Sequence, residues 1–415
     1  MWIKIKPMDV IIFRTSKPFG AGESFRAEGI FPPTAIPFIG ALRSRAITHL
    51  MDICPDDQPD YWQYDHNFQN KLSCQIINQL GTPDDLGPLS FNGPYLSLNE
   101  SICLPLPRDL MQPTTSETGF LSFLTPGTSC WPVTVSKPNL DKILMANDSK
   151  TEACESGFLS GNHLGNYLTG DSTEYFVISD IVSKIEPRIG IKMSSDGTAE
   201  HGLIYNVLFH RLVETASFWF KITSTLGNES SLLPDKGFLA LGGESRAAYF
   251  EKVSDEKLPA PLSEEQDNNI KQQMVKSLVD KRTFKLYLIS PAIFEQGWLP
   301  DCIDPHTYEW EPLTGFHTKL IAAAVGKYAS ISGWDLMKNL PKPLLRAVPA
   351  GSVYFFQARE PFTEATAIQF IENIHQKSII QNKSNTPHFQ LAYFRSAGFG
   401  TTAVGVWHER NRLYV

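Results

Sequence analysis

The chain has 415 residues, of which 42% are hydrophobic and 20% are charged, the ordinary composition of a globular protein. At about 150 residues per domain, this length predicts two or three domains with sizeable cores. The net charge of −7 argues against nonspecific nucleic-acid binding, but it does not exclude a local basic groove, because binding depends on where the lysines and arginines lie.

Cysteine usage and hydropathy indicate the cellular compartment. Six cysteines are scattered along the chain without a C-x-x-C pair or a histidine at zinc-like spacing, which predicts no metal site and fits a reducing compartment. The opening MWIKIKPMDV lacks the apolar run of a signal peptide, and the longest apolar runs, such as LIAAAV, are too short to cross a bilayer. We therefore expect a cytoplasmic protein with no membrane partner.

The N-terminal segment predicts strands followed by a helix. MWIKIK alternates apolar and polar residues and VIIFR follows it, so these runs indicate a strand pair or one bent strand. After the Pro-Pro pair, a helix with Thr34 as N-cap is predicted by apolar residues that recur every four positions: Phe38, Leu42, Ala46 and Leu50. On this helix Arg43 and Arg45 lie at opposite margins of the apolar stripe, so both can reach solvent or a ligand.

The middle of the chain is less regular. Residues 52–175 are rich in Pro, Gly, Asn, Asp and Ser, which predicts long loops and insertions. PRIGIK and LIYNVLF indicate strands around SSDGTAEHG, which has the chemistry of an Asp-Gly turn, and ASFWFKI is a good alternating strand. Residues 254–273 are polar and mixed in charge, which predicts a linker or surface loop.

The C-terminal part again predicts strands around a helix. TFKLYLIS and SVYFFQA indicate strands, KLIAAAVGKYASISGW indicates two strands joined at Gly326-Lys327, and TEATAIQFIENIHQK indicates a helix with Thr363 as N-cap. LAYFR and TAVGVW indicate two closing strands. Each half thus has an early strand, a helix and further strands, an α+β pattern that permits two βαββαβ units.

Glycines cluster between the two closing runs. Gly398, Gly400 and Ala403 match the dinucleotide pattern G-x-G-x-x-G/A, but that pattern requires a helix after the loop, and the segment that follows is strand-like. Two interpretations stay open: a hairpin in which backbone passes close to backbone, or a loop whose N–H groups bind phosphates. A second pair, in LGGESRAAYF, predicts a tight turn followed by Arg246.

Side chains suited to catalysis are not patterned. The ten histidines have no Ser, Cys or second His partner at a catalytic spacing, so we expect neither a nucleophile nor a metal site. Basic residues instead occur beside aromatic residues and glycines, the combination that binds single-stranded RNA through phosphate contacts and base stacking. The alternative is that these charges only flank strand ends in solvent.

Several segments together resemble one known family. They are PMDVIIFRTSKPFGAGESFRAEGIFPPTAIPFIGALRSR, EPRIGIK with AEHGLIYNVLFHRL, LALGGESRAA, ISGWDLMKNLPKPLLRAVPAGSVYFF and RSAGFGTTAVGVW. In this order, spread over residues 7–407, they are similar to the RAMP-superfamily subunit three of type III-B CRISPR (Cmr) effector complexes. The Gly-Trp-Asp and PAGSVYFF pieces are the most specific part of the resemblance.

The resemblance implies both a fold and a role. The expected fold is two ferredoxin-like (RRM-related, βαββαβ) domains, residues 1–215 with long insertions and residues 216–415 ending in the glycine-rich loop. The expected role is a non-catalytic subunit, without cofactor, that acts in antiviral defence. Such a subunit binds the 5′ tag of the crRNA together with the adjacent RAMP backbone subunit and docks on the large polymerase/cyclase-like subunit.

The candidate RNA-binding residues combine the basic clusters with the glycines of the terminal loop. They are Arg14, Lys17, Arg26, Arg43, Arg45, Arg188, Lys192, Arg246, Arg395, Gly398, Gly400 and Gly405. Because GFGTTAVG itself contains no Lys or Arg, a charge contact at that loop must come from outside it, for instance from Arg395.

Two other functions stay open. A CRISPR-repeat endoribonuclease of the same superfamily has the same domains but cuts RNA, typically with a histidine as general acid or base. A purely structural subunit would make no RNA contact. Incubation with repeat RNA separates the enzyme from the binder, and crosslinking of the assembled complex separates the binder from the scaffold.

Overall fold

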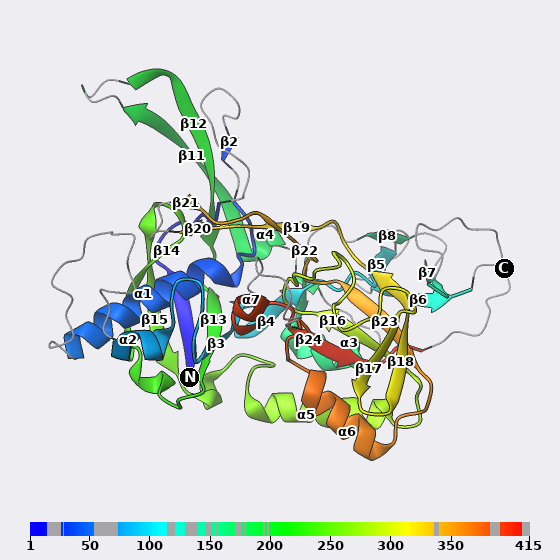
Figure 1. Ribbon diagram of the computed structural model, residues 1–415. Helices are drawn as coiled ribbons and strands as arrows, with labels where there is room; N and C mark the ends of the chain where they lie inside the picture. Colours follow the sequence, from blue (N-terminus) through cyan, green and yellow to red (C-terminus); the bar gives the residue numbers. More distant parts are fainter. Residues whose placement is uncertain are drawn as a thin grey trace.

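The computed structural model describes residues 1–14, 26–27, 29–53, 74–113, 121–128, 140–146, 151–153, 157–170, 176–177, 179–193, 196, 199–335, 340–381 and 391–408. The fold is α+β, as expected, and its sheets are mostly antiparallel (Figure 1). Among the described helices, none combines the length and the apolar character that a membrane span requires.

An eight-stranded sheet forms the N-terminal half. Its strands, in spatial order, are β10 (Phe176–Val177), β9 (Phe158–Ser160), β4 (Ser101–Pro105), β3 (Leu89–Leu98), β13 (Ala216–Ser224), β1 (Trp2–Pro7), β15 (Arg246–Val253) and β14 (Lys236–Leu241). Helix α1 (Ala35–Ile53) packs on this sheet through Phe38, whose ring centroid lies 5.0 Å from those of Phe218 and Phe220. The predicted strands MWIKIK and ASFWFKI and the predicted helix after Thr34 are confirmed.

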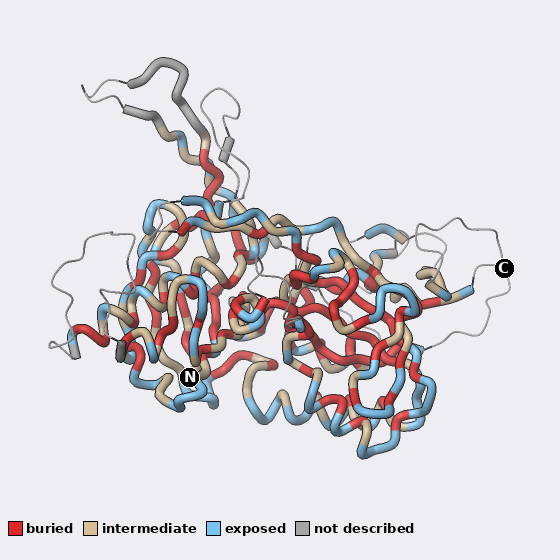
Figure 2. The backbone as a smooth tube through the Cα atoms, in the orientation of Figure 1, coloured by how far each residue is buried: buried red, intermediate tan, exposed pale blue. Residues whose placement is uncertain are grey.

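A five-stranded sheet forms the C-terminal half. Its order is β17 (Glu309–Leu313), β18 (Phe316–Ala324), β23 (Val353–Ala358), β16 (Thr283–Leu288) and β24 (Thr402–Gly405). Helix α6 (Glu364–Ile374) is capped by Thr363, as predicted, and its Phe370 packs edge-on against Phe284 at 4.9 Å. Burial is concentrated in the two sheets (Figure 2).

Both halves follow the strand order of a βαββαβ unit, in which the third strand lies between the first and the second and the fourth flanks the first. The four places are filled by β1, β3, β13 and β15 in one sheet, and by β16, β18, β23 and β24 in the other. Each half, however, has one of the two helices, because residues 225–245 and residues 289–315, all of them described, contain no α-helix. Two complete units are therefore not formed.

A buried ion pair joins the C-terminal sheet to a smaller sheet. A four-stranded sheet of β7 (Ile143–Ala146), β6 (Ser122–Gly127), β5 (Leu110–Pro113) and β8 (Thr151–Ala153) lies beside the C-terminal sheet, where Lys142 N–H donates to Ile321 O at 3.1 Å. Asp109, just before β5, accepts from Lys285 Nζ of β16 and from Tyr167 OH, both at 2.8 Å. Lys285 and Asp109 are each 1% exposed.

A long hairpin projects from the N-terminal half as an arm (Figure 1). It consists of β11 (Ser183–Met193) and β12 (Ala199–Leu212), and β2 (Arg26–Ala27) runs parallel to β12. Its root is fixed by Ile11, which exchanges backbone hydrogen bonds of 2.9 and 2.8 Å with His210. The strands expected around the Asp-Gly turn are confirmed, whereas VIIFR forms bridges instead of a strand.

The remaining described elements lie mostly in the connections. The helices are α2 (Cys74–Leu80), α3 (Leu164–Thr169), α4 (Ser179–Val182), α5 (Glu264–Leu278) and α7 (Leu391–Ser396). The small ribbons are β19 (Ala329–Ile331) with β22 (Leu345–Ala347), and β20 (Trp334–Asp335) with β21 (Leu340–Pro341).

Four expectations about local structure are corrected. Residues 52–175 contribute β3, β4 and β9 to the large sheet, so they are more than insertions. The supposed linker contains α5, whose Ser263 cap accepts from Gln266 N–H. LAYFR is helix α7, not a strand. Gly326-Lys327 does not close a hairpin, because β18 pairs with β23 and β19 pairs with β22.

The expected domain boundary at 215/216 stays a prediction, and the pairing of the strands shows where the two sheets divide. β13 and β15 both pair with β1, so the N-terminal sheet extends to Val253, and the C-terminal sheet begins at Thr283. The segment between them contains α5, which lies against α3 and α6.

Candidate functional site

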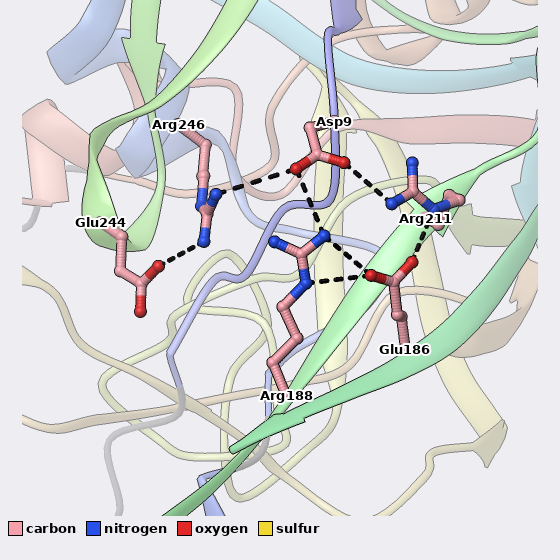
Figure 3. A network of polar contacts seen from close by, with 6 residues as sticks. All are labelled: Asp9, Glu186, Arg188, Arg211, Glu244 and Arg246. Atoms are coloured by element: carbon pink, nitrogen blue, oxygen red, sulfur yellow. Dashed lines mark hydrogen bonds and ion pairs between the residues drawn. The ribbon is translucent and has the colours of Figure 1, made fainter. Parts of the chain in front are cut away.

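Side chains from three separate segments meet at the root of the arm (Figure 3). We call them the arginine network, which comprises Asp9, Glu186, Arg188, Arg211, Glu244 and Arg246. Asp9 follows β1, Arg246 begins β15, and Glu186 and Arg188 stand two residues apart on β11 and so share one face of the strand. Of these residues, the sequence predicted Arg188 and Arg246.

Asp9 connects the three segments. Its carboxylate lies 2.8 Å from Arg211 Nη2, 3.3 Å from Arg188 Nη2 and 3.8 Å from Arg246 Nη1. Glu186 holds Arg188 at 2.8 Å and Arg211 at 2.6 Å, and Glu244 holds Arg246 at 2.6 Å. Each arginine is therefore fixed by at least one carboxylate, and the network has no net charge.

An aromatic ring lies beneath two of these arginines. The guanidinium carbon of Arg188 lies 5.6 Å from the centroid of Phe209, and that of Arg246 lies 5.1 Å from it. Phe209 is buried in a small apolar cluster with Val10, Ile12 and Val207. The arginine side chains above it are between a quarter and a half exposed, so the network forms part of the surface.

The Gly-Gly turn explains how Arg246 reaches this place. Gly242 has φ +72°, and a Cβ on it would lie 2.6 Å from Ile12 O, so a side chain would push the turn off the N-terminal segment. The N–H of Gly243 donates to the same carbonyl at 2.8 Å. The turn is therefore clamped on residue 12, close to Asp9 in the chain, which brings Arg246 within reach of Asp9.

The charges in the network stabilise one another. The backbone N–H of Val10, with the Arg211 and Arg188 side chains, holds the pKa of Asp9 below its usual value. Hydrogen bonds from Arg211 and Arg188 lower the pKa of Glu186, and the bond to Glu186 raises the pKa of Arg188. A guanidinium has five N–H donors, so an arginine held by one carboxylate can still donate to a phosphate or stack on a base.

Other predicted basic residues lie near or along the arm. Arg14 is exposed and its backbone bridges to Gly29. Arg26 is in β2, where it pairs with Asn206 of β12, and Lys192 lies on β11 beyond Arg188. Lys17 lies outside the described residues.

The two arginines of α1 differ in their surroundings. Arg43 Nη2 donates to Thr82 O at 2.7 Å, and burial lowers the pKa of its guanidinium. Arg45 lies beside β14, where a Cβ on Gly237 would be 3.8 Å from its Nε. Arg43 is thus engaged inside the protein, whereas the sequence predicted that both side chains can reach solvent or a ligand.

The glycines of the terminal segment are packed against the protein itself. A Cβ on Gly398 (φ +81°) would lie 2.5 Å from Phe91 O, and one on Gly400 (φ +73°) would lie 2.8 Å from Ile380 Cγ1. At Gly405 the neighbour is Leu168 O, at 2.9 Å. The expected RNA-facing loop is therefore buried in this structure, because the C-terminal segment approaches β3 and α3 too closely for side chains. Arg395, on α7, is exposed.

The sequence predicted none of Asp9, Glu186, Phe209, Arg211 and Glu244. The partners of Asp9 lie far from it in sequence, so no local spacing indicates it. One signal was present: in a hairpin with this register, alternation places Glu186 and Arg188 of β11 on the same face as Phe209 and Arg211 of β12.

A partly buried histidine, His210, lies at the same root. His210 stacks on Phe31, with ring centroids 4.6 Å apart, and its Nδ1 lies 2.9 Å from Ser183 Oγ. Burial lowers the pKa of His210. Among the described residues, no group of three His, Cys, Asp or Glu side chains is arranged to hold a metal ion.

The sequence matches the model of one family, described as CRISPR-associated protein (Cas_Cmr3), over residues 3–407. The chain belongs to the CRISPR-associated Cmr3 family. It is therefore a subunit of a type III-B Cmr effector complex. The match to the Cmr3 family includes all three segments that form the arginine network.

A solved structure shows a related fold. A chain of the type III-B Cmr-beta complex bound to cognate target RNA and AMPPnP, state 1, is 15% identical with a TM-score of 0.50, and the likeness covers 97% of this chain and 98% of that chain. A chain of Cmr-beta bound to cognate target RNA is 15% identical with a TM-score of 0.49, over 97% of this chain and 96% of that chain. No curated protein sequence matches this chain.

Proposed function

We propose that this Cmr3-family chain is a non-catalytic, cytoplasmic subunit that binds the single-stranded 5′ tag of the crRNA in CRISPR antiviral defence, with the arginine network as its main contact. The observation that carries the proposal is the convergence of Arg188 and Arg246 on one ring and one carboxylate from motifs far apart in the sequence. Arginines held in place over an aromatic platform suit phosphate binding and base stacking.

We also propose that the chain docks on the large polymerase/cyclase-like subunit and on the adjacent RAMP backbone subunit. The two sheets, each with the strand order of a βαββαβ unit, would be divergent ferredoxin-like scaffolds that have each lost one helix. In this arrangement the N-terminal scaffold carries the RNA contact.

The test uses the assembled effector complex loaded with guide RNA that contains 4-thiouridine in the tag. After irradiation, we expect crosslinked peptides from β11, β12 or the start of β15. Crosslinks confined to other subunits would contradict the proposal and favour a structural role. A complex whose chain carries Phe238→Leu, an exposed aromatic on β14, serves as a control that should crosslink normally.

The nuclease alternative has its own measurement. Purified chain is incubated with repeat RNA under single-turnover conditions, with and without divalent metal. We expect the RNA to stay intact. Cleavage that a single His→Ala substitution abolishes would establish the endoribonuclease function instead.

A further inference from the structure

Between β18 and β23 the chain leaves the C-terminal sheet as a ribbon, whose described residues are 325–335 and 340–348. β19 pairs with β22, and β20 pairs with β21 beyond them. The ribbon reaches the N-terminal half, because a Cβ on Gly333 would lie 3.6 Å from Ile36 Cγ2 of α1. Lys342 Nζ lies 5.4 Å from the ring centroid of Tyr393 on α7. The ribbon thus spans the two halves (Figure 1).

The two faces of the β19–β22 pair differ in chemistry. Ile331 and Ala347 are buried against the body of the protein. On the other face Tyr328 is 50% exposed, and the exposed Arg346 places its guanidinium 4.9 Å from the Tyr328 ring centroid. Trp334, on β20, is 55% exposed. We call Tyr328, Trp334 and Arg346 the ribbon ledge.

The ribbon is basic although the whole chain is acidic. Its described residues include the basic side chains Lys327, Lys342 and Arg346, whereas its acidic residue, Asp335, is buried. The full chain has a net charge of −7. Positive charge is therefore concentrated where large aromatic side chains are exposed. This combination complements a polyanion that also presents flat aromatic rings.

We propose that the ribbon ledge is a stacking surface for unpaired bases of the guide RNA tag. Tyr328 and Trp334 each offer a ring to a base, Arg346 orients Tyr328 and adds a stacking plane, and Lys327 neutralises phosphate. The inference rests on the proposed function and extends it, because it adds a second contact surface, on the ribbon between β18 and β23, to the arginine network.

Unpaired RNA fits the ledge better than a protein partner does. The exposed Leu340 and Leu344 beside it would suit a protein interface, as would tyrosine, tryptophan and arginine. Lysine is depleted at such interfaces, however, and the exposed Lys327 stands next to Tyr328 in the chain. Double-stranded RNA does not expose base faces, so aromatic stacking selects the unpaired part of the guide.

The test measures binding of guide RNA to assembled complexes that contain Tyr328→Leu, Trp334→Leu or both. Leucine keeps an apolar side chain but cannot stack, so each substitution should weaken binding of tag-bearing RNA by about tenfold. A scrambled tag should show the same loss, because stacking tolerates sequence, and an RNA without the tag should show none. Phe238→Leu, at an equally exposed aromatic on β14, is the matched control and should change nothing.

The outcomes separate this inference from the function on which it rests. Unchanged RNA affinity in Tyr328→Leu and Trp334→Leu overturns the ledge, and loss of assembly with unchanged RNA affinity would identify the face as a protein contact. If Arg188→Gln weakens RNA binding while the ribbon variants do not, the proposed function stands and the ledge fails. If wild-type complex does not bind the tag through this chain at all, both fail.

Discussion

The two halves have the same strand order but place their motif residues differently. In the N-terminal half, the segments that match the family motifs bring arginines together at a partly exposed surface over Phe209. In the C-terminal half, the matching glycines are buried against β3 and α3. The comparison teaches that an equally good motif match supports a ligand contact in one half and close packing between halves in the other.

The largest expected effect comes from the buried ion pair between the C-terminal sheet and the four-stranded sheet beside it. Lys285→Met leaves Asp109 buried without its cation, so it should lower the free energy of unfolding by about 3–5 kcal/mol. Lys319→Met is the matched control, because the pair that it forms with Asp141 is exposed, and its loss should cost under about 1 kcal/mol. Urea unfolding measures both. Equal losses would show that the buried pair does not hold these two sheets together.

The next prediction separates two reasons for a glycine: a positive φ, and a neighbour too close for a side chain. Gly398 and Gly315 have similar positive φ, +81° and +78°, but only Gly398 has a neighbour within reach of a Cβ. Gly315→Ala should cost about 1 kcal/mol for the backbone conformation, and Gly398→Ala about 3 kcal/mol because the contact with Phe91 O must also open. If Gly398→Ala keeps full stability and loses RNA binding, the glycine loop is an RNA contact after all.

Acid should destabilise the C-terminal half through His375. Burial lowers the pKa of His375 to about 4, and Asp267 and Lys271 are the charged groups that act on it. In the unfolded chain, His375 titrates near its ordinary pKa of 6.5. At a pH between the two pKa values the unfolded chain therefore binds more protons than the folded chain, so the free energy of unfolding falls as the pH falls. From pH 7 to pH 5 the loss should be about 2 kcal/mol.

His375→Asn provides the comparison for this titration. Asn can keep the acceptor that His375 Nδ1 offers to the Val404 N–H, but it does not titrate. The loss of stability between pH 7 and pH 5, measured by urea unfolding, should therefore shrink in the variant. The same pH dependence in both proteins would place the responsible group elsewhere.

The smallest expected effect on stability comes from the two arginines of α1, which differ in their surroundings. Arg43→Ala removes the hydrogen bond to Thr82 O and should cost about 1.5 kcal/mol, whereas Arg45→Ala should change stability by less than about 0.5 kcal/mol. Thermal unfolding of the two variants measures the difference. If Arg43→Ala leaves stability unchanged but weakens RNA binding, the arginine is free to act on a ligand.

The sequence predicts the elements whose pattern is local. The alternation in β1 and β13, the spacing in α1 and the Thr363 cap of α6 are all local signals, and each is confirmed. Helix α5 was missed because its surface is polar and it buries few apolar side chains: Ile270, Met274 and Leu278 are buried, and Val275 is partly buried against the core. LAYFR has strand propensity, but tertiary packing makes it helical.

The site was predictable only in part for the same physical reason. Arg188 and Arg246 were found by motif, but Asp9 reaches Arg188 across 179 positions and Arg211 across 202 positions. Such pairs depend on how the arm is seated on the sheet, which composition and periodicity do not describe. The sequence indicated that the glycines of the terminal segment allow a close approach of the backbone. Only the folded chain shows which residues they approach.

One measurement tests the central claim, that the arginine network of the N-terminal half contacts the guide RNA. The affinity of assembled complex for tag-bearing RNA is titrated against salt, with wild type and with Arg188→Gln plus Arg246→Gln. For each phosphate contact that is lost, the log–log slope should fall by about 0.7, with binding weakened and thermal stability nearly unchanged. An affinity and a slope equal to those of the wild type would contradict the claim and leave the network as a structural joint of the arm.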